Sequence, residues 1–200
     1  MRMRNPKFKD EVINNCDYYY DKDNTFSNTN PIHIEIGMGK GQFLLNMALN
    51  NPNINYIGIE KYSSVAAFAI KRINEYKPDN LKIIIGDVIN LSDLLKNKVS
   101  CIYLNFSDPW PKERHAKRRL TSPEYLKLYD DLFVDKKIII QKTDNDSLFA
   151  YSLEQYKNYG YKVEEISYDL HSENIDNIET EYEEKFCKKG VKIKYVKVKK

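Results

Sequence analysis

Three acidic residues stand at or near the ends of short β-rich runs. Glu35 is the fourth residue of IHIEI, Glu60 follows YIGI, and Asp87 comes two residues after LKIII. Because the carboxyl ends of parallel strands meet at one edge of a sheet, we expect these carboxylates to line one crevice. Such a crevice repels anions and favours a ligand that carries positive charge and hydrogen-bond donors. For each carboxylate taken alone, capping of a helix is the alternative role.

A glycine-rich loop follows the first of these runs. Gly37, Gly39 and Gly41 stand between IHIEI and QFLLNMAL, where they allow a tight turn and let a ligand approach bare backbone. The loop lacks the dinucleotide pattern GxGxxG because Gln42 occupies the third glycine position, and it also lacks the phosphate-binding pattern GxxxxGK[ST]. With the carboxylates nearby, it favours S-adenosylmethionine, which has cationic sulfonium and ammonium groups. Alone, it could be merely a tight turn.

A fourth carboxylate begins the segment DPWPKERHAKRR, residues 108–119. Asp108 follows another β-rich run, so it should emerge at the same sheet edge and meet both cofactor and substrate. Pro109 and Pro111 restrict the backbone around Trp110, which lets the loop keep its shape. Two interpretations of Trp110 remain open, a lid that packs on the sheet and a ring that stacks on a base.

The positive charge of the chain is concentrated in this segment. KERHAKRR, residues 112–119, has five Lys or Arg residues against one Glu, or +4, whereas the whole chain carries only +3. A local basic patch favours a polyanionic partner such as nucleic acid, since one surface suffices to meet phosphates. The alternative is a solvated basic loop.

Alternating strand-like and helix-like segments would position these residues, as in a parallel sheet covered on both faces. Strands are predicted at 32–36, 56–59, 81–85, 100–106 and 136–141, followed by two more at 161–166 and 191–198. Helices are predicted at 42–49, 63–76, 124–133 and 145–159.

Several local features accompany these elements. Ser63 or Ser64 should cap the second helix, and Ser122 should cap the third, ahead of Pro123. A bulge is predicted at Tyr195 and Val196. The acidic connection ENIDNIETEYEE fits none of these elements.

Length and composition predict one domain, residues 31–200, after a polar and basic arm, residues 1–30. The N-terminal stretch lacks an apolar signal core, and no apolar run approaches the roughly 20 residues that span a bilayer, so we expect a cytoplasmic protein without a membrane partner. Three cysteines and three histidines are scattered without CxxC spacing. We therefore expect neither a disulfide framework nor a metal site.

The sequence resembles a known family, the bacterial tRNA (guanine-N7-)-methyltransferases, which are class I enzymes dependent on S-adenosylmethionine. The resemblance spans nearly the whole chain and rests on EIGMGKG, the strand ends at Glu60 and at Gly86 and Asp87, DPWPKERHAKRRL, TSPEYLKLY, KTDN and TEYEEKF. The chain departs from the family in its short N-terminal arm and in DLFVDKKIII, which lacks the glycine expected before the fifth strand. The resemblance implies an α/β, Rossmann-like class I methyltransferase fold, with a seven-stranded mostly parallel sheet, helices on both faces and an antiparallel C-terminal strand.

The resemblance also implies an activity, transfer of a methyl group from S-adenosyl-L-methionine to N7 of guanine 46 in the variable loop of tRNA. The sequence leaves open whether the protein is a monomer or a homodimer. The implied cofactor contacts are Glu35, Gly37, Gly39, Glu60, Asp87 and Asp108, and Asp108 is also the implied catalytic residue. The implied tRNA contacts are Lys112, Arg114, His115, Lys117, Arg118, Arg119, Asp144, Thr180, Glu181, Tyr182 and Glu183. Without the resemblance, Asp144 would be a helix cap and TEYEE the exposed face of a strand or turn.

Guanine N7 offers a lone pair that is largely unprotonated at neutral pH, so its methylation needs no base. Alignment of the reactants can do most of the work. Asp108 would then hold the N–H edge of guanine or stabilise positive charge on the ring. Three other functions stay open: a methyltransferase of proteins or small molecules, an RNA-binding module without catalysis, and a nicotinamide oxidoreductase. The basic cluster counts against the protein or small-molecule methyltransferase. The four carboxylates count against the RNA-binding module, and the broken GxGxxG counts against the oxidoreductase.

Overall fold

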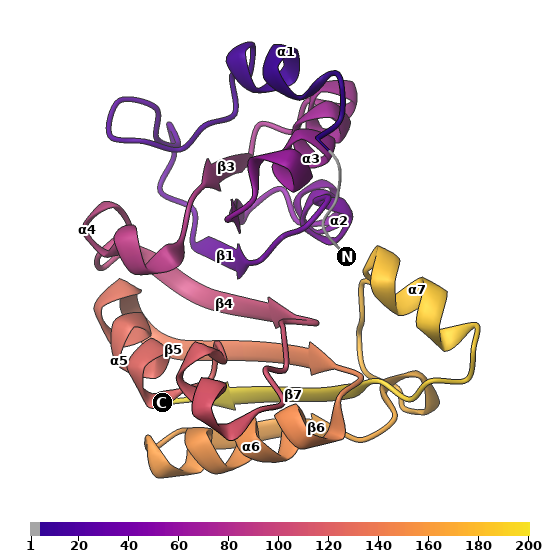
Figure 1. The fold of residues 1–200 in the computed structure, drawn as a ribbon. Coiled ribbons are helices and arrows are strands. Elements are labelled where there is room, and N and C mark those ends of the chain that lie inside the picture. The colour runs from indigo at the N-terminus through magenta and orange to yellow at the C-terminus, as the bar shows by residue number, and fades with distance from the viewer. Residues whose placement is uncertain (1–4) are drawn as a thin grey trace. The chain divides into compact units, whose positions relative to one another are not determined.

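A computed structural model describes residues 5–200 of the protein. These residues fall into two compact units, one ending at Leu94 and one spanning Leu95–Lys200 (Figure 1). The two units contribute seven strands in all. The division into an arm, residues 1–30, and one domain, residues 31–200, stays a prediction, and residues 1–4 of that arm lie outside the described residues.

The first unit is built on three parallel strands in the order β3-β2-β1. They are β1 (Ile32–Ile36), β2 (Asn55–Glu60) and β3 (Leu81–Ile85), and each lies within one residue of its predicted bounds. Every residue of the central strand β2 is buried, as expected for a parallel strand that is covered on both faces. The register sets Glu35 beside Gly58 and Glu60 beside Ile85, so the carboxyl ends of the strands lie at one edge.

Two helices connect these strands. α2 (Gln42–Asn50) starts directly after Gly41, and α3 (Ser63–Tyr76) has Tyr62 as its cap residue. The prediction that Ser63 or Ser64 caps α3 is wrong. Both serines lie inside the helix because the extended Tyr62 already offers its carbonyl to the N–H groups of Val65 and Ala66. A 3₁₀ turn (Val88–Asn90) and α4 (Ser92–Leu95) follow β3.

The described part of the N-terminal arm packs against this unit. α1 (Lys9–Asn14) is followed by residues 18–20, which run beside β3. Tyr20 N donates to Ile83 O at 2.8 Å, and Ile83 N donates to Tyr18 O at 2.7 Å. Phe8 meets Phe68 of α3 edge to face, with ring centroids 5.2 Å apart. These residues thus extend the hydrogen-bonding pattern of the outer strand.

The second unit has four strands in the order β4-β5-β7-β6. β4 (Val99–Asn105) and β5 (Phe133–Thr143) are parallel, whereas β7 (Lys194–Lys199) is antiparallel to both β5 and β6 (Lys162–Ser167), which confirms the antiparallel C-terminal strand. The predicted bulge at Tyr195 and Val196 is wrong. β7 pairs with β5 without interruption, and the register shift lies on the outer strand β6, between Val163 and Glu165.

Three helices belong to this unit, α5 (Pro123–Leu132), α6 (Asp146–Asn158) and α7 (Glu181–Cys187). Ser122 stands at the cap position of α5, as predicted, but its hydroxyl donates to Lys117 O instead of capping the helix. α7 shows that TEYEE is neither a strand nor a turn. Two 3₁₀ segments (Glu113–Arg118 and Leu170–Ser172) complete the unit. Across residues 5–200, no helix has the length and apolar character needed to cross a membrane.

Candidate functional site

The glycine loop after β1 leaves open space beside its backbone. Gly37 and Gly39 have φ angles of +83° and +59°, and a Cβ added to either would meet no atom within 4 Å. Gly41 differs, because its Cβ would lie 2.8 Å from the Cβ of Ala69 on α3. Gly41 therefore serves close helix packing, whereas Gly37 and Gly39 expose bare backbone that a ligand can approach.

Glu60 ties this loop to the end of β2. Its side chain is buried, with one oxygen accepting from Gly39 N at 3.1 Å and the other from Tyr62 N at 2.8 Å. Gly37 N also donates to the carbonyl of Ile59 at 2.8 Å. The carboxylate thus fixes the loop conformation at the end of β2.

Asp87 and Glu35 complete the acidic edge of this unit. Glu35 lies on β1 and is 2% exposed. Asp87 accepts from Ile89 N at 3.2 Å and from Lys61 Nζ at 2.9 Å. Burial alone would raise the pKa of Asp87, but these hydrogen bonds and the charge of Lys61 lower it below its ordinary value, so the group is ionised at neutral pH. Lys61 was not among the predicted site residues, and its only signal in the sequence was a cation directly after Glu60.

The loop after β4 carries Asp108, which is exposed. Two non-glycine residues of this loop have left-handed backbones, Phe106 with φ +50° and Trp110 with φ +42°. Each such residue costs about 1–3 kcal/mol, so its surroundings must hold it in place. The Trp110 ring meets His115 edge to face at 5.7 Å, and the guanidinium of Arg118 lies 4.9 Å from its centroid. Trp110 is therefore packed against the basic segment.

The basic segment presents most of its predicted tRNA contacts to solvent. The exposed cations are Lys112, Arg114, Lys117 and Arg118, and His115 is half-buried. Arg119 differs, because it is only 7% exposed and donates to the carbonyls of Pro109 and Trp110. The guanidinium of Arg119 therefore contacts the protein itself, unlike the exposed cations of this segment.

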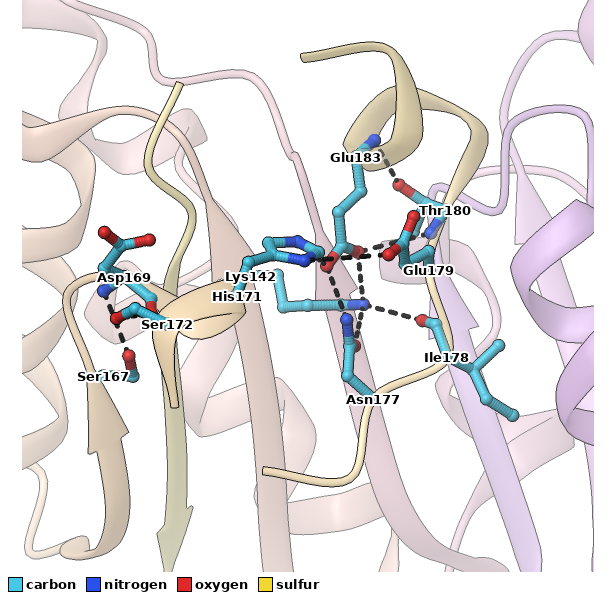
Figure 2. Close-up of polar contacts among 10 residues, drawn as sticks. All are labelled: Lys142, Ser167, Asp169, His171, Ser172, Asn177, Ile178, Glu179, Thr180 and Glu183. Atoms are coloured by element: carbon cyan, nitrogen blue, oxygen red, sulfur yellow. Dashed lines mark hydrogen bonds and ion pairs between the residues drawn. The ribbon is translucent and has the colours of Figure 1, made fainter. Parts of the chain in front are cut away.

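A buried ion pair joins β5 to α7 (Figure 2). Lys142 Nζ donates to Glu183 at 2.7 Å, to the Asn177 side chain at 2.8 Å and to the Ile178 carbonyl at 2.9 Å. The two charged side chains are 3% and 0% exposed. Glu183 also accepts from Asn177 at 2.6 Å and contacts Nε2 of His171 at 3.0 Å. Neither Asn177 nor His171 was among the predicted site residues.

Thr180 and Glu183 also cap α7. Thr180 Oγ1 accepts from Glu183 N at 3.0 Å, and the Glu183 carboxylate accepts from Thr180 N at 3.3 Å, a reciprocal capping box. Both side chains are buried. The structure therefore gives them a supporting role for the start of α7, and any contact of theirs with tRNA stays a prediction.

Asp144 and Tyr182 face each other at the end of β5. Tyr182 donates its hydroxyl hydrogen to Asp144 at 3.0 Å, and burial together with this carboxylate raises the pKa of Tyr182 to about 12. Asp144 does not cap α6. Asn145 fills that role, since its side chain accepts from Leu148 N at 2.8 Å.

The predicted site residues thus divide between the units. Glu35, Gly37, Gly39, Glu60 and Asp87 lie in the first unit, and Asp108 and the predicted tRNA contacts lie in the second. The contact of Asp108 with the cofactor stays a prediction. Within the described range, no cluster of three or more His, Cys, Asp or Glu residues could hold a metal ion.

Comparisons with known proteins show the family to which the chain belongs. The family model described as "Putative methyltransferase" matches residues 29–196. A tRNA (guanine-N(7)-)-methyltransferase of Lachnoclostridium phytofermentans is 50% identical over 95% of this chain and 94% of its own, and one of Bacillus subtilis is 44% identical over the same shares.

Solved structures give the fold. An antibiotic-related methyltransferase matches with a TM-score of 0.63 and 19% identity, over 100% of this chain and 96% of its own. A methyltransferase of Aquifex aeolicus, described as dependent on S-adenosylmethionine, matches with a TM-score of 0.57 and 13% identity, over 86% and 84% of the two chains. These likenesses confirm the predicted class I methyltransferase fold.

Proposed function

Because the chain belongs to the tRNA (guanine-N7-)-methyltransferase family, we propose that it methylates N7 of guanine 46 in the variable loop of tRNA. The cofactor of the family is S-adenosyl-L-methionine, and its chemistry fits the residues of the first unit. The observation that carries the proposal is the loop after β4, where an exposed carboxylate is followed by four exposed cations. A reactive centre next to a phosphate-binding surface is what modification of a folded RNA requires.

The first unit binds the cofactor. S-adenosylmethionine, when bound, supplies a methyl group on positively charged sulfur. Gly37 and Gly39 give it room at the backbone, because among residues 5–200 no neighbouring atom lies within 4 Å of a Cβ placed on either glycine. A carboxylate such as Glu60 is a suitable acceptor for ligand hydroxyl groups, and the carboxyl groups of Glu35 and Asp87 favour a cationic ligand at this edge.

Asp108 acts on the guanine. N7 carries no proton at neutral pH, so the residue is not needed as a general base. Its carboxylate accepts hydrogen bonds from the N–H edge of the base or offsets the positive charge that develops on the ring. In either role the negative charge matters, and the exposure of Asp108 leaves it accessible to a base from outside the chain.

The second unit grips the tRNA. Lys112, Arg114, Lys117 and Arg118 neutralise backbone phosphates, which supplies affinity without sequence preference. Glu181, Tyr182 and Asp144 form a polar edge at the start of α7, where the neutral hydroxyl of Tyr182 is already oriented by Asp144. Thr180 and Glu183 support this edge from inside.

The test is incubation of the purified protein with methyl-labelled S-adenosylmethionine and an unmodified tRNA transcript, followed by mapping of the labelled nucleotide. We expect label at guanine 46 and none on a matched transcript with adenine there. Label at another guanine would overturn the position, and label on protein would overturn the substrate. Asp108→Asn should lower kcat by about 100-fold or more, in the range found when one charge-stabilising group is lost. Near-normal turnover in a folded variant would remove Asp108 from the reaction.

A further inference from the structure

Arg119 ends the basic segment, yet its side chain turns into the second unit. Its side chain is 9% exposed, whereas Lys117 and Arg118 beside it are exposed. The resemblance to the family implied an RNA contact for all three residues. A guanidinium that is buried against its own chain cannot reach phosphates as its neighbours do.

The Arg119 side chain holds two consecutive backbone carbonyls. Nε donates to Pro109 O at 3.1 Å, and Nη2 donates to Trp110 O at 3.1 Å. The planar guanidinium presents several N–H groups in a fixed fork, a geometry that the single ammonium of lysine cannot reproduce. The fork therefore fixes the Pro109–Trp110 and Trp110–Pro111 peptide groups, in the two residues that follow Asp108.

This part of the loop needs external support. Pro109 and Pro111 have no backbone N–H, so they cannot stabilise the turn by donating main-chain hydrogen bonds. Trp110 lies between them with φ +42°, a left-handed conformation that a tryptophan rarely adopts. The contacts from Arg119 provide such support, because they satisfy the carbonyls on both sides of the strained residue.

Arg119 is itself firmly anchored. Its guanidinium carbon lies 4.3 Å from the ring centroid of Tyr151, in the middle of α6. Its backbone N–H donates to Ala116 O at 3.0 Å, and its carbonyl accepts from Ser122 N at 2.9 Å. The Arg119 side chain thus links the loop to a regular helix.

We propose that Arg119 is a positioning residue, which fixes the backbone at Pro109 and Trp110 and thereby places the carboxylate of Asp108, and that it does not bind tRNA phosphates. The assignment rests on the proposed role of Asp108. This assignment predicts that the charge of Arg119 does not contribute to tRNA affinity. The two N–H donors of its guanidinium fork are instead essential to turnover.

A matched set of substitutions separates the two roles. Arg119→Gln and Lys117→Gln each remove one positive charge, and Arg119→Lys keeps the charge but removes the fork. For each variant, kcat and the KM for tRNA are measured over a salt series. Lys127→Ala, on the exposed side of α5, controls for surface substitution.

We expect Arg119→Lys to lower kcat by about 10-fold or more, because loss of an orienting contact can cost that much in a catalytic geometry. Arg119→Gln should leave the salt slope of log KM unchanged, whereas Lys117→Gln should reduce it by about 0.7–0.9. Lys127→Ala should change neither quantity. The proposal is overturned if Arg119→Gln flattens the slope as Lys117→Gln does, or if Arg119→Lys turns over normally.

A structural readout keeps the test independent of the proposed function. Trp110 is the only tryptophan of the chain, so its emission reports directly on this loop. We expect Arg119→Lys to shift that emission and to speed amide exchange around Lys112, with no change in Lys127→Ala. If the unmodified protein fails to methylate tRNA while Arg119→Lys still loosens the loop, the proposed function fails and the anchoring stands. An undisturbed loop overturns the anchoring whatever the activity.

Discussion

The Lys142–Glu183 pair makes a quantitative prediction about stability. Lys142→Met would leave the Glu183 carboxylate, which is 0% exposed, without its counter-ion. Removal of one partner from a buried ion pair costs about 3–5 kcal/mol, because a charge stays behind in a medium that solvates it poorly. A natural domain has about 5–15 kcal/mol in total. We therefore expect this single substitution to leave the protein only marginally stable against unfolding.

The double variant Lys142→Met with Glu183→Met distinguishes stranded charge from lost packing. With both charges gone, the remaining cost comes from donors such as Asn177 that lose their acceptor, about 1–3 kcal/mol each where they stay buried. The loss in the double variant should therefore be well below the sum of the two single losses. A coupling of about 2–3 kcal/mol is the expected difference.

Urea unfolding followed by Trp110 fluorescence is the appropriate assay, because that tryptophan lies in the same unit as the pair. The control is Lys197→Met, which breaks a more exposed pair with Glu165 and should cost at most about 1 kcal/mol. The reasoning is refuted if Lys142→Met costs no more than Lys197→Met, or if the two single losses simply add.

Two further predictions concern the basic segment and a buried thiol. Replacement of Lys117 and Arg118 together by Gln should reduce the salt slope of tRNA binding by about 1.4–1.8, because two phosphate contacts are lost. Filter binding over a salt series measures this slope. An unchanged slope would mean that both residues belong to a solvated loop that does not contact tRNA. Burial raises the pKa of Cys101 to about 12, so iodoacetamide at pH 8 should leave it unmodified in the folded protein and alkylate it in urea. Peptide mass spectrometry reads this out, and rapid labelling without urea would contradict it.

The strands of the first unit were predictable because each is rich in isoleucine and ends before glycine or polar residues. IHIEI and LKIII match β1 and β3 to the residue, because their β-branched and apolar residues favour a strand that packs in the core. The glycine loop was equally readable, because its positive φ angles demand glycine.

What the sequence could not show depends on distant partners. EYEEKFC has the composition of a solvent-exposed segment, and Glu183 is buried only because Lys142, 41 residues away, neutralises it. Arg119 looks like its neighbours in the sequence, and only its burial and its contacts in the folded chain show that it points inward. Asp144 and Asn145 are both residue types that cap helices. Only the structure shows that Asn145 caps α6 while Asp144 accepts a hydrogen bond from Tyr182.

The stretch at Tyr18–Tyr20 bears on how this enzyme can be handled. β3 is the outermost strand of the first unit, and a bare outer strand is a template on which foreign chains can polymerise. By lying along Ile83, residues 18–20 occupy the amide and the carbonyl of that residue in the middle of β3. A purification tag should therefore be attached ahead of Pro6. Tyr18–Tyr20 should be kept, although the polar composition of this N-terminal segment makes it look dispensable.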